Sequence, residues 1–407
     1  MIARARVPAR GDLGPVSVMA MLGARGPMSR ADLARALQVS PASVTQMTKS
    51  LLAAGVIAEL ESVPSRGGRP ARLLGLAHSG GGALGAKVAP DHITLVDVSL
   101  DGSAHNARTV AFDAAAPDAI DQVVRVLRAA VEEYDGLLLG VGVGIPGTVE
   151  DQATGVVQAP IIGWHEVPLG DLLRRALKVP VLIDNDVNTV AVAERLYGSA
   201  SDFSSPLLVT IGRGVGSGLI SDGVLLRGNG GGAGEIGHVP VVEDGPECEC
   251  GNTGCLEAII GAAGLVRRAR ELGVLGPDQG TDDLREAADR GDERARALFA
   301  EAGRHLGRAL AGVVHVVAPE VVVVLGEGLA SWTHWEHGFE QAFRRHLLPS
   351  RRALPVIVEP WADDKWAVGA ASLVLYSPFD VSGTGGEQGR LVRARLQDGA
   401  PVEAAAR

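Results

Sequence analysis

The sequence predicts an α/β protein in which a small N-terminal winged helix-turn-helix domain precedes a larger domain of alternating strands and helices. Within the first 77 residues, short helical segments are followed by a strand, a Gly-rich turn and a second strand. Apolar strand segments then alternate with longer helical segments over roughly 300 residues. At 407 residues the chain also exceeds the ~250 to 300 residues at which single cores stop growing. We expect domains at 1–77 and 83–379, and a partly disordered tail at 380–407.

The N-terminal segment differs in charge from the rest of the chain. Residues 1–75 hold ten Lys/Arg and four Asp/Glu, a net charge of +6, which leaves 28 basic and 44 acidic residues, a net charge of −16, for the remainder. A basic module beside an acidic body is typical of a polyanion-binding domain attached to a domain that binds something else. A basic, solvated surface is the alternative.

Composition also bears on location. No run of about 18 uncharged apolar residues is present, so we expect no membrane span. The three cysteines are too few for a disulfide framework in a chain of this length, and all three fall within eight positions. We therefore expect a soluble protein of the cytoplasm, with the cysteines holding a metal.

Two helices joined by a tight turn are expected near the N-terminus. Ser29 is a candidate N-cap, with Asp32 three positions later in a box-like arrangement. The next helix begins after Ser40, with Pro41 in its first turn, where the missing amide costs nothing. The turn Gln38-Val39 between them completes a pattern similar to a helix-turn-helix.

The second of these helices has the pattern of a recognition helix. Its apolar residues repeat at helical spacing and are expected to face inward: Val44, Met47 and Leu51. The candidate DNA-contacting side chains, which are small, polar or basic, are Ser43, Thr45, Gln46 and Lys49. In a major groove Gln46 could contact a base edge and Lys49 a phosphate. An ordinary amphipathic helix with a solvated face is the alternative.

The segment after Gly55, VIAELESVPSRGGRPARLLGL, predicts a wing. It reads as strand, Gly-rich turn and strand, with Arg66, Arg69 and Arg72 in or beside the turn. Arginine at such a tip can lie along phosphates or enter a minor groove, and glycine permits close backbone approach. Together with the preceding helices, this wing predicts binding to double-stranded DNA.

The larger domain is expected to have two related lobes with a cleft between them. Its clearest strands are predicted at 93–98, 136–143, 179–183, 207–211, 219–220 and 321–325. In α/β folds ligands bind at the carboxyl ends of strands and in clefts, so the binding site is expected there.

A metal site is predicted from the segment GGAGEIGHVPVVEDGPECECGNTGCLE. His238, Cys248, Cys250 and Cys255 supply one imidazole and three thiolates within 18 residues. Four soft ligands match a closed tetrahedral zinc site with no open position, so the Zn²⁺ is expected to be structural. Three buried cysteines without a metal are the alternative.

These motifs together resemble the ROK family of bacterial repressors, open reading frames and sugar kinases. The resemblance covers the winged helix, IPG at 145–147, DNDVN, IGRGVGSGLI, GAGEIGH, CxCGxxGCLE, LGEGL and DDKWAVGAA. It implies an actin-like (ribonuclease H-like) two-lobed domain of the sugar-kinase type. It also implies a set of sugar-binding residues: Asn185, Asp186, Glu235, His238 and Glu257. His238 would bind zinc through one nitrogen and a sugar hydroxyl through the other. Taken singly, these side chains could instead belong to turns and helix ends.

The nucleotide motifs depart from those of the kinases. Asp186 matches the catalytic base, but Ala89, Pro90 and Asp91 stand where the first phosphate loop needs glycines and a threonine. Arg213 replaces a threonine in the second glycine loop, and Glu327 replaces a glycine in LGEGL. We therefore expect no catalysis, with Asp186 kept as a sugar ligand.

The leading hypothesis is thus a DNA-binding transcriptional regulator, a repressor, controlled by a sugar or sugar phosphate. Its expected partners are an operator and an identical chain, in a homodimer or a dimer of dimers, because symmetric pairs contact two half-sites. The alternative is an ATP-dependent, glucokinase-like sugar kinase, either with or without DNA-binding activity.

Overall fold

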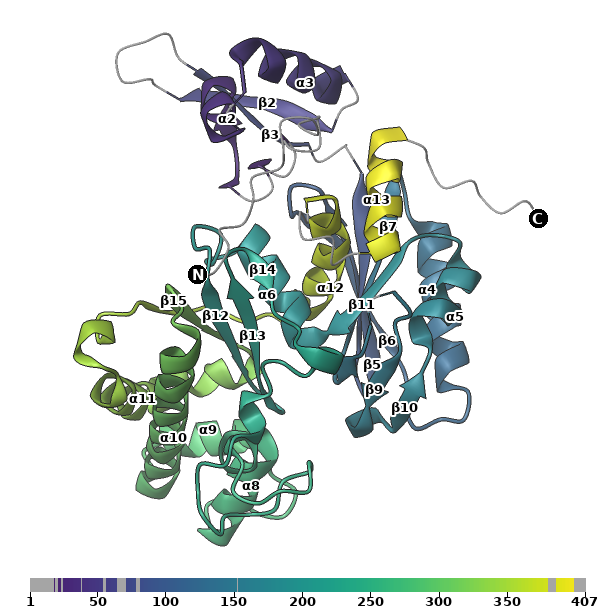
Figure 1. Ribbon diagram of the computed structural model, residues 1–407. Coiled ribbons are helices and arrows are strands. Elements are labelled where there is room, and N and C mark those ends of the chain that lie inside the picture. The colour runs from purple at the N-terminus through teal and green to yellow at the C-terminus, as the bar shows by residue number, and fades with distance from the viewer. Residues whose placement is uncertain are drawn as a thin grey trace. The chain divides into compact units, whose positions relative to one another are not determined.

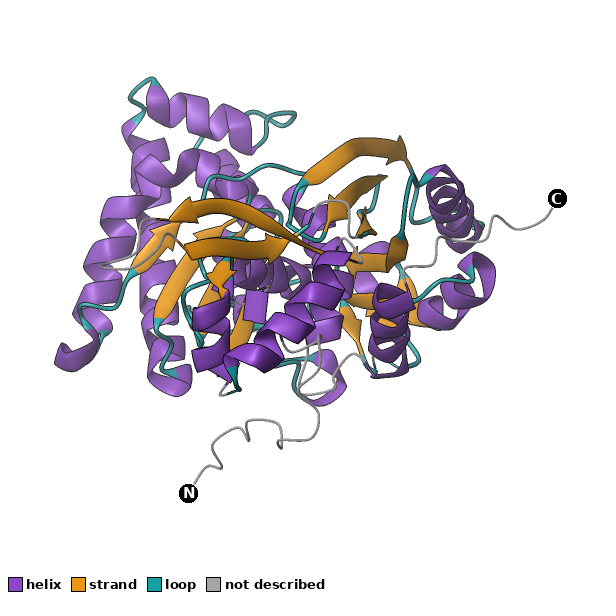
Figure 2. Cartoon of the chain, turned by 90° about the horizontal axis from the view of Figure 1, so that it is seen from above, coloured by secondary structure: helices purple, strands orange, loops and turns teal. Residues whose placement is uncertain are grey.

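The computed structural model describes residues 18, 21–22, 25–37, 39–53, 56–63, 71–77, 81–151, 153–379 and 386–398. The chain divides into two compact units. The first comprises Met1–Asp202, Gly228–Gly231 and Asp364–Arg407, and the second comprises Phe203–Arg227 and Gly232–Asp363. Figure 1 labels the elements, and Figure 2 shows strands flanked by helices.

The N-terminal domain is a winged helix. Its elements are β1 (Met28–Ser29), α2 (Arg30–Leu37), α3 (Pro41–Ala53), β2 (Ile57–Val63) and β3 (Ala71–Leu76). The strands form an antiparallel sheet in the order β1-β3-β2. The expected caps are present, since Ser29 Oγ accepts from the Asp32 N–H at 3.1 Å and Ser40 Oγ accepts from the Ser43 N–H at 3.1 Å.

The first lobe is built on a five-stranded sheet in the order β11-β7-β4-β5-β6. Its strands are β4 (Gly82–Val88), β5 (His92–Ser99), β6 (Ala104–Ala111), β7 (Leu138–Ile145) and β11 (Val181–Asn185). A second, small sheet contains β8 (Thr148–Val149), β9 (Val157–Ala159) and β10 (Trp164–Val167), followed along the chain by α5. The helices are α4 (Ala119–Glu133), α5 (Leu169–Leu177), α6 (Asp186–Leu196) and α12 (Lys365–Tyr376), with short 3-10 turns at Pro160–Ile162 and Ser377–Phe379.

Strand β4 sends alternate residues to opposite faces of this sheet. Leu84 and Val88 join the buried cluster that also contains residues of α4. Gly85 faces α12, where a Cβ would lie 1.9 Å from the carbonyl oxygen of Ala367. Only glycine allows this close packing of helix on strand. The same alternation places Lys87, a charged residue in an apolar strand, on the α12 side, where its Nζ lies 4.9 Å from the centroid of the Trp366 ring.

The second lobe repeats this strand order. Its sheet runs β14-β13-β12-β15-β16, from β12 (Pro206–Ile211), β13 (Val215–Ser221), β14 (Val224–Leu225), β15 (Val321–Leu325) and β16 (Val356–Val358). In both lobes three consecutive strands are antiparallel and two later strands run parallel to the first. The expectation of two related lobes is therefore confirmed.

Helices pack against this second sheet, and their apolar residues form one large buried cluster with those of the strands. They are α7 (Leu256–Ile260), α8 (Ala262–Glu271), α9 (Thr281–Asp289), α10 (Glu293–Val317) and α11 (Trp332–His346). Short 3-10 turns of this lobe lie at Ile236–His238, Glu327–Ser331 and Pro349–Arg351, whereas the turn at Asn229–Gly231 belongs to the first unit. Among the described residues, no helix is long and apolar enough to cross a bilayer.

The tail at 380–407, expected to be partly disordered, contains helix α13 (Gly386–Asp398). Val392 and Leu396 of this helix are buried. Gln388 Oε1 accepts from the Val181 N–H at 3.2 Å, and Arg395 Nε donates to the Leu138 carbonyl at 3.1 Å. The tail was expected to be partly disordered because its composition is charged and Ala-rich. Composition alone does not reveal that two widely spaced apolar residues are buried. Residues 380–385 and 399–407 lie outside the described part of the chain.

Candidate functional site

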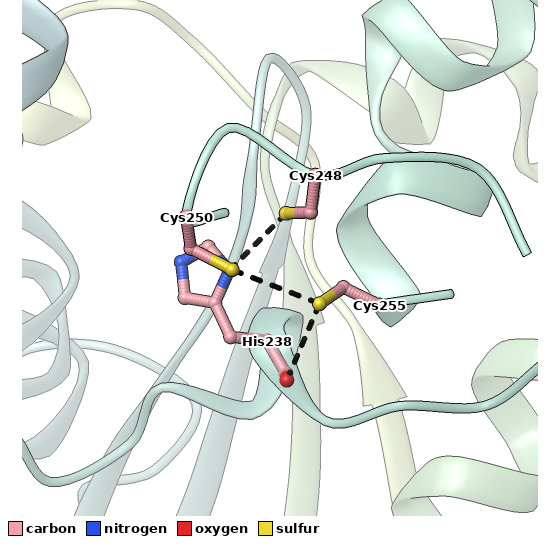
Figure 3. A group of neighbouring side chains, drawn as sticks. All are labelled: His238, Cys248, Cys250 and Cys255. Atoms are coloured by element: carbon pink, nitrogen blue, oxygen red, sulfur yellow. Dashed lines mark hydrogen bonds between the residues drawn. The ribbon is translucent and has the colours of Figure 1, made fainter. Parts of the chain in front are cut away.

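The predicted metal ligands lie together in the second lobe. The imidazole of His238 and the thiols of Cys248, Cys250 and Cys255 point toward one another, and their ligand atoms all lie within 4.8 Å of one another (Figure 3). His238 Nδ1 is 3.5 Å from the sulfur of Cys248, and the sulfurs of Cys250 and Cys255 are 3.8 Å apart. These four side chains could hold a metal ion.

Local backbone structure brings these ligands together. The Cys248 N–H donates to the carbonyl of Asn252 at 2.8 Å, closing a tight turn in which Gly251 has φ 88°. A β-bridge between Pro240 and Cys255 joins the two ends of the segment. The thiols differ in environment. Burial raises the pKa of Cys255 to about 12, whereas the N–H of Asn252 lowers the pKa of Cys250 to about 7.

His238 presents its two nitrogens to different groups. Nδ1 faces the thiol of Cys248 at 3.5 Å, and Nε2 lies 3.8 Å from Glu235 Oε2. The imidazole is half-buried and Glu235 is exposed. If Nδ1 binds the metal, Nε2 is left on the side of Glu235 and can bind a polar ligand.

Glu257 lies beside this histidine, in the first turn of α7. A Cβ placed on Gly237 would lie 3.4 Å from the Cβ of Glu257. Oε2 of Glu257 accepts from the backbone N–H of Val215 at 2.8 Å. This bond fixes the carboxylate but leaves acceptor capacity for a further donor. Glu235 and His238 therefore adjoin each other, and Glu257 lies next to Gly237, the residue before His238.

Asn185 and Asp186 belong to the first lobe, at the start of α6. Asn185 caps the helix, because its Oδ1 accepts from the N–H groups of Val187 and Asn188 at 2.9 and 3.2 Å. Its Nδ2 donates to the carbonyl of Gly147 at 2.9 Å. Asn185 therefore has a structural role as the N-cap of α6.

Asp186 is buried and both of its carboxylate oxygens have partners. Oδ1 accepts from the Val187 N–H at 2.8 Å, and Oδ2 forms a buried ion pair with Lys87 Nζ. The Trp366 ring covers the ammonium. Sequence reasoning missed Lys87 and Trp366. The available signal was a single lysine in the otherwise apolar strand sequence GALGAKV.

A tight turn between β4 and β5 is formed by Ala89, Pro90 and Asp91, the residues that differ from the first phosphate loop of the kinases. The Ala89 N–H donates to the carbonyl of His92 at 2.9 Å, and the carbonyl of Pro90 accepts from the Ala114 N–H at 2.9 Å. Asp91 Oδ1 lies 2.8 Å from His92 Nδ1. Proline offers no N–H and Asp91 adds a negative charge, so this turn is poorly suited to a phosphate.

The predicted recognition helix presents its polar side to solvent. Val44, Met47 and Leu51 of α3 are buried, as expected. The candidate DNA-contacting residues of the helix are all exposed: Ser43, Thr45, Gln46 and Lys49. The Thr45 hydroxyl donates to the Pro41 carbonyl at 2.8 Å. The candidate wing residues Arg66 and Arg69 lie outside the described residues, while Arg72 forms an ion pair with Glu59 at the base of the wing.

The fold and the site define a class. The chain has a winged helix followed by two lobes with the same strand order, and the second lobe contains a His/Cys₃ cluster. This combination is typical of a sugar-kinase-type α/β domain joined to a DNA-binding domain. A model of the ROK family matches residues 89–376, and a model of the MarR family matches residues 14–64. The chain therefore belongs to the ROK family, with a MarR-type winged helix at its N-terminus.

Relatives of two kinds match the chain. The DNA-binding transcriptional dual regulator NagC of Escherichia coli is 30% identical over 377 residues, which cover 89% of this chain and 92% of NagC. The structure of a ROK family transcriptional regulator, a homolog of E. coli MLC, matches with a TM-score of 0.77 and 26% identity over 94% of this chain and 98% of that one. A ROK glucokinase from Streptomyces griseus, in complex with glucose and AMPPNP, matches with a TM-score of 0.63 and 29% identity over 72% of this chain and 98% of its own.

Proposed function

We propose that this protein is a transcriptional repressor that binds an operator in double-stranded DNA through its winged helix and responds to a sugar or sugar phosphate bound by its ROK domain. The observation that carries the proposal is the presence of both domains in one chain, together with the match of a DNA-binding regulator over 89% of its length. The kinase relative covers only 72% of the chain. Because a transcriptional regulator must reach the DNA, the protein in this proposal is located in the cytoplasm.

In this proposal α3 enters the major groove and the wing contacts the backbone or the minor groove. Gln46 contacts base edges. Further contacts to bases and phosphates come from Ser43, Thr45 and Lys49. The wing contributes the positive charges of Arg66 and Arg69. One short helix offers little specific affinity, so the active form is a homodimer, or a dimer of dimers, that contacts two half-sites.

The metal in this proposal is a structural Zn²⁺. With Zn–S distances of about 2.3 Å and Zn–N of about 2.0 to 2.1 Å, a tetrahedral site has S–S edges of about 3.8 Å and N–S edges of about 3.5 Å. The Cys250–Cys255 and His238–Cys248 separations are 3.8 and 3.5 Å. When bound, the ion would neutralise the buried thiolates and fix the orientation of His238.

The effector ligands in this proposal are Asn185, Asp186, Glu235, His238 and Glu257. Carboxylates and an imidazole Nε2 suit the hydroxyl groups of a sugar ring, each of which both donates and accepts hydrogen bonds. A ligand lacking one of these hydroxyls leaves a polar group unpaired, which gives selectivity.

One feature favours a sensor over a kinase. Phosphoryl transfer depends on positioning of the triphosphate, and the turn at Ala89–Asp91 lacks a suitable cradle. The protein therefore binds its sugar without phosphorylating it.

The proposal is tested with the purified full-length chain and a labelled DNA fragment from upstream of its own gene. Fluorescence anisotropy measures the Kd for DNA alone and with a panel of hexoses, amino sugars, pentoses and their phosphates. One of these compounds is expected to change the Kd by a free energy of about 1 to 3 kcal/mol. Asp186→Asn should reduce this response and leave the Kd without sugar unchanged, whereas Asp171→Asn, an exposed aspartate of the same lobe, should change neither.

The same panel is run in a coupled ATP-consumption assay. Turnover on the order of 1 to 100 per second with any of the sugars would establish the kinase instead. Absence of specific DNA binding at moderate salt would contradict the regulator.

A further inference from the structure

Two backbone donors of the turn between β12 and β13 are occupied by carboxylates of its own chain. Oε1 of Glu327 accepts from the Arg213 N–H at 3.0 Å. At the other end of the turn, Oε2 of Glu257 accepts from the Val215 N–H at 2.8 Å. The Gly212 N–H is also used, since it donates to the carbonyl of Gly214 at 3.0 Å.

The two glycines of this turn make room for these carboxylates. A Cβ on Gly212 would lie 2.2 Å from both Cδ and Oε1 of Glu327. A Cβ on Gly214 would lie 2.6 Å from Oε2 of Glu257. Both distances are far below a van der Waals contact, so each carboxylate rests where only a glycine backbone leaves space. Glycine turns whose N–H groups meet a negative group are the usual structure of anion-binding sites in proteins.

Backbone geometry aims Glu327 at the turn. It follows β15, which pairs in parallel with β12, so the ends of the two strands are adjacent. Gly326 has φ 112°, which turns the chain sharply after the strand, and Glu327 begins the 3-10 turn Glu327–Ser331. Glu327 and Arg213 are both exposed, so this turn is accessible to an anion from solution.

We propose that Gly212–Val215 is an anion-binding turn that the protein fills with its own Glu327 carboxylate, so that phosphoryl groups are excluded from it. The carboxylate occupies the place of a phosphate oxygen at the Arg213 N–H and repels a second anion. The turn thereby keeps its conformation without a nucleotide. This proposal concerns only the second lobe and does not depend on which effector the protein binds.

The test measures binding of pyrophosphate to the full-length protein by isothermal titration calorimetry. Wild type is compared with Glu327→Gly, which removes the carboxylate, and with Glu327→Gln, which keeps its shape but not its charge. The control is Glu320→Gly. Glu320 is another exposed carboxylate, at the other end of β15, and it accepts from the N–H groups of Ser204 and Ser205 at 2.6 and 2.8 Å.

Glu327→Gly is expected to bind pyrophosphate at least about tenfold more tightly than wild type, the factor that corresponds to one charge-assisted hydrogen bond. Glu327→Gln should lie between the two, and Glu320→Gly should match wild type. If Glu327→Gly does not fold, Glu327→Gln alone decides, and equal affinity of this variant and wild type would overturn the proposal. Tight binding by wild type, or an equal gain in Glu320→Gly, would overturn it as well.

Discussion

The buried ion pair between Lys87 and Asp186 gives a prediction whose size follows from the structure. Lys87→Met removes the ammonium but keeps an unbranched apolar side chain beside Trp366. It leaves the Asp186 carboxylate, whose side chain is 13% exposed, with the Val187 N–H at 2.8 Å as a remaining donor. Breaking one side of a buried pair costs about 3 to 5 kcal/mol. Because one donor remains, we expect a loss of about 2 to 3 kcal/mol in the free energy of unfolding.

A double-mutant cycle separates this pair from simple packing. Asp186→Asn keeps the shape and an acceptor oxygen, and the ammonium keeps its contact with the Trp366 ring, so its cost should be about 1 to 2 kcal/mol. In the double variant neither charge is left unpaired. Its cost should be smaller than the sum of the single costs by about 1 to 2 kcal/mol.

The assay is urea unfolding of the purified chain, followed by circular dichroism and tryptophan fluorescence. Arg125→Met is the control, because Arg125 of the same lobe forms an ion pair with Asp118 at 2.9 Å in which the two side chains are 61% and 51% exposed. An exposed ion pair of this kind contributes at most about 1 kcal/mol. Additive single costs, or a Lys87→Met variant as stable as Arg125→Met, would refute the role of the pair.

Three further predictions concern the metal, the DNA and pH. Cys250→Ser should lower the zinc content below one ion per chain and lower the melting temperature, whereas the neighbouring Glu249→Gln should do neither; unchanged zinc by elemental analysis would contradict the site. Gln46→Ala should relax the sequence preference in anisotropy measurements, and Lys49→Ala should weaken binding to all sequences and reduce the salt slope by about 1; identical behaviour of the two variants would contradict their separate roles. Hydrogen bonding to Arg294 lowers the pKa of Asp292, the N-cap of α10. Its stabilising effect is therefore present above its pKa in the unfolded chain and lost as pH falls through its folded pKa, so the melting temperatures of wild type and Asp292→Asn should differ at neutral pH and converge in acid.

Features encoded by short spacing could be predicted from the sequence. The metal ligands lie within 18 residues, so a loop of any plausible shape brings them together, and the structure places their ligand atoms within 4.8 Å. The buried stripe of α3 follows from helical periodicity alone, since Val44, Met47 and Leu51 lie on one face. The caps at Ser29 and Ser40 depend only on neighbours three positions away.

Features that depend on tertiary packing could not be predicted. Lys87 and Asp186 are 99 positions apart, and nothing local to either residue indicates the other. The lysine is paired because β4 and the start of α6 meet beside α12. The donors of the Gly212–Val215 turn likewise receive carboxylates from residues 42 and 114 positions away. The sequence identified Glu327 as a departure from the kinases, but not where its carboxylate lies.

Helix α13 has a practical consequence for the protein's boundaries. Strand β11 is the edge of its sheet, and Gln388 accepts from the backbone N–H of Val181 at the start of this strand. A chain shortened before Gly386 would leave that N–H and the Leu138 carbonyl without these partners, and would uncover the apolar surface against Val392 and Leu396. Exposed strand edges and apolar surface promote aggregation. Truncations that remove the tail should therefore yield insoluble protein, whereas affinity tags placed after Asp398 should be tolerated.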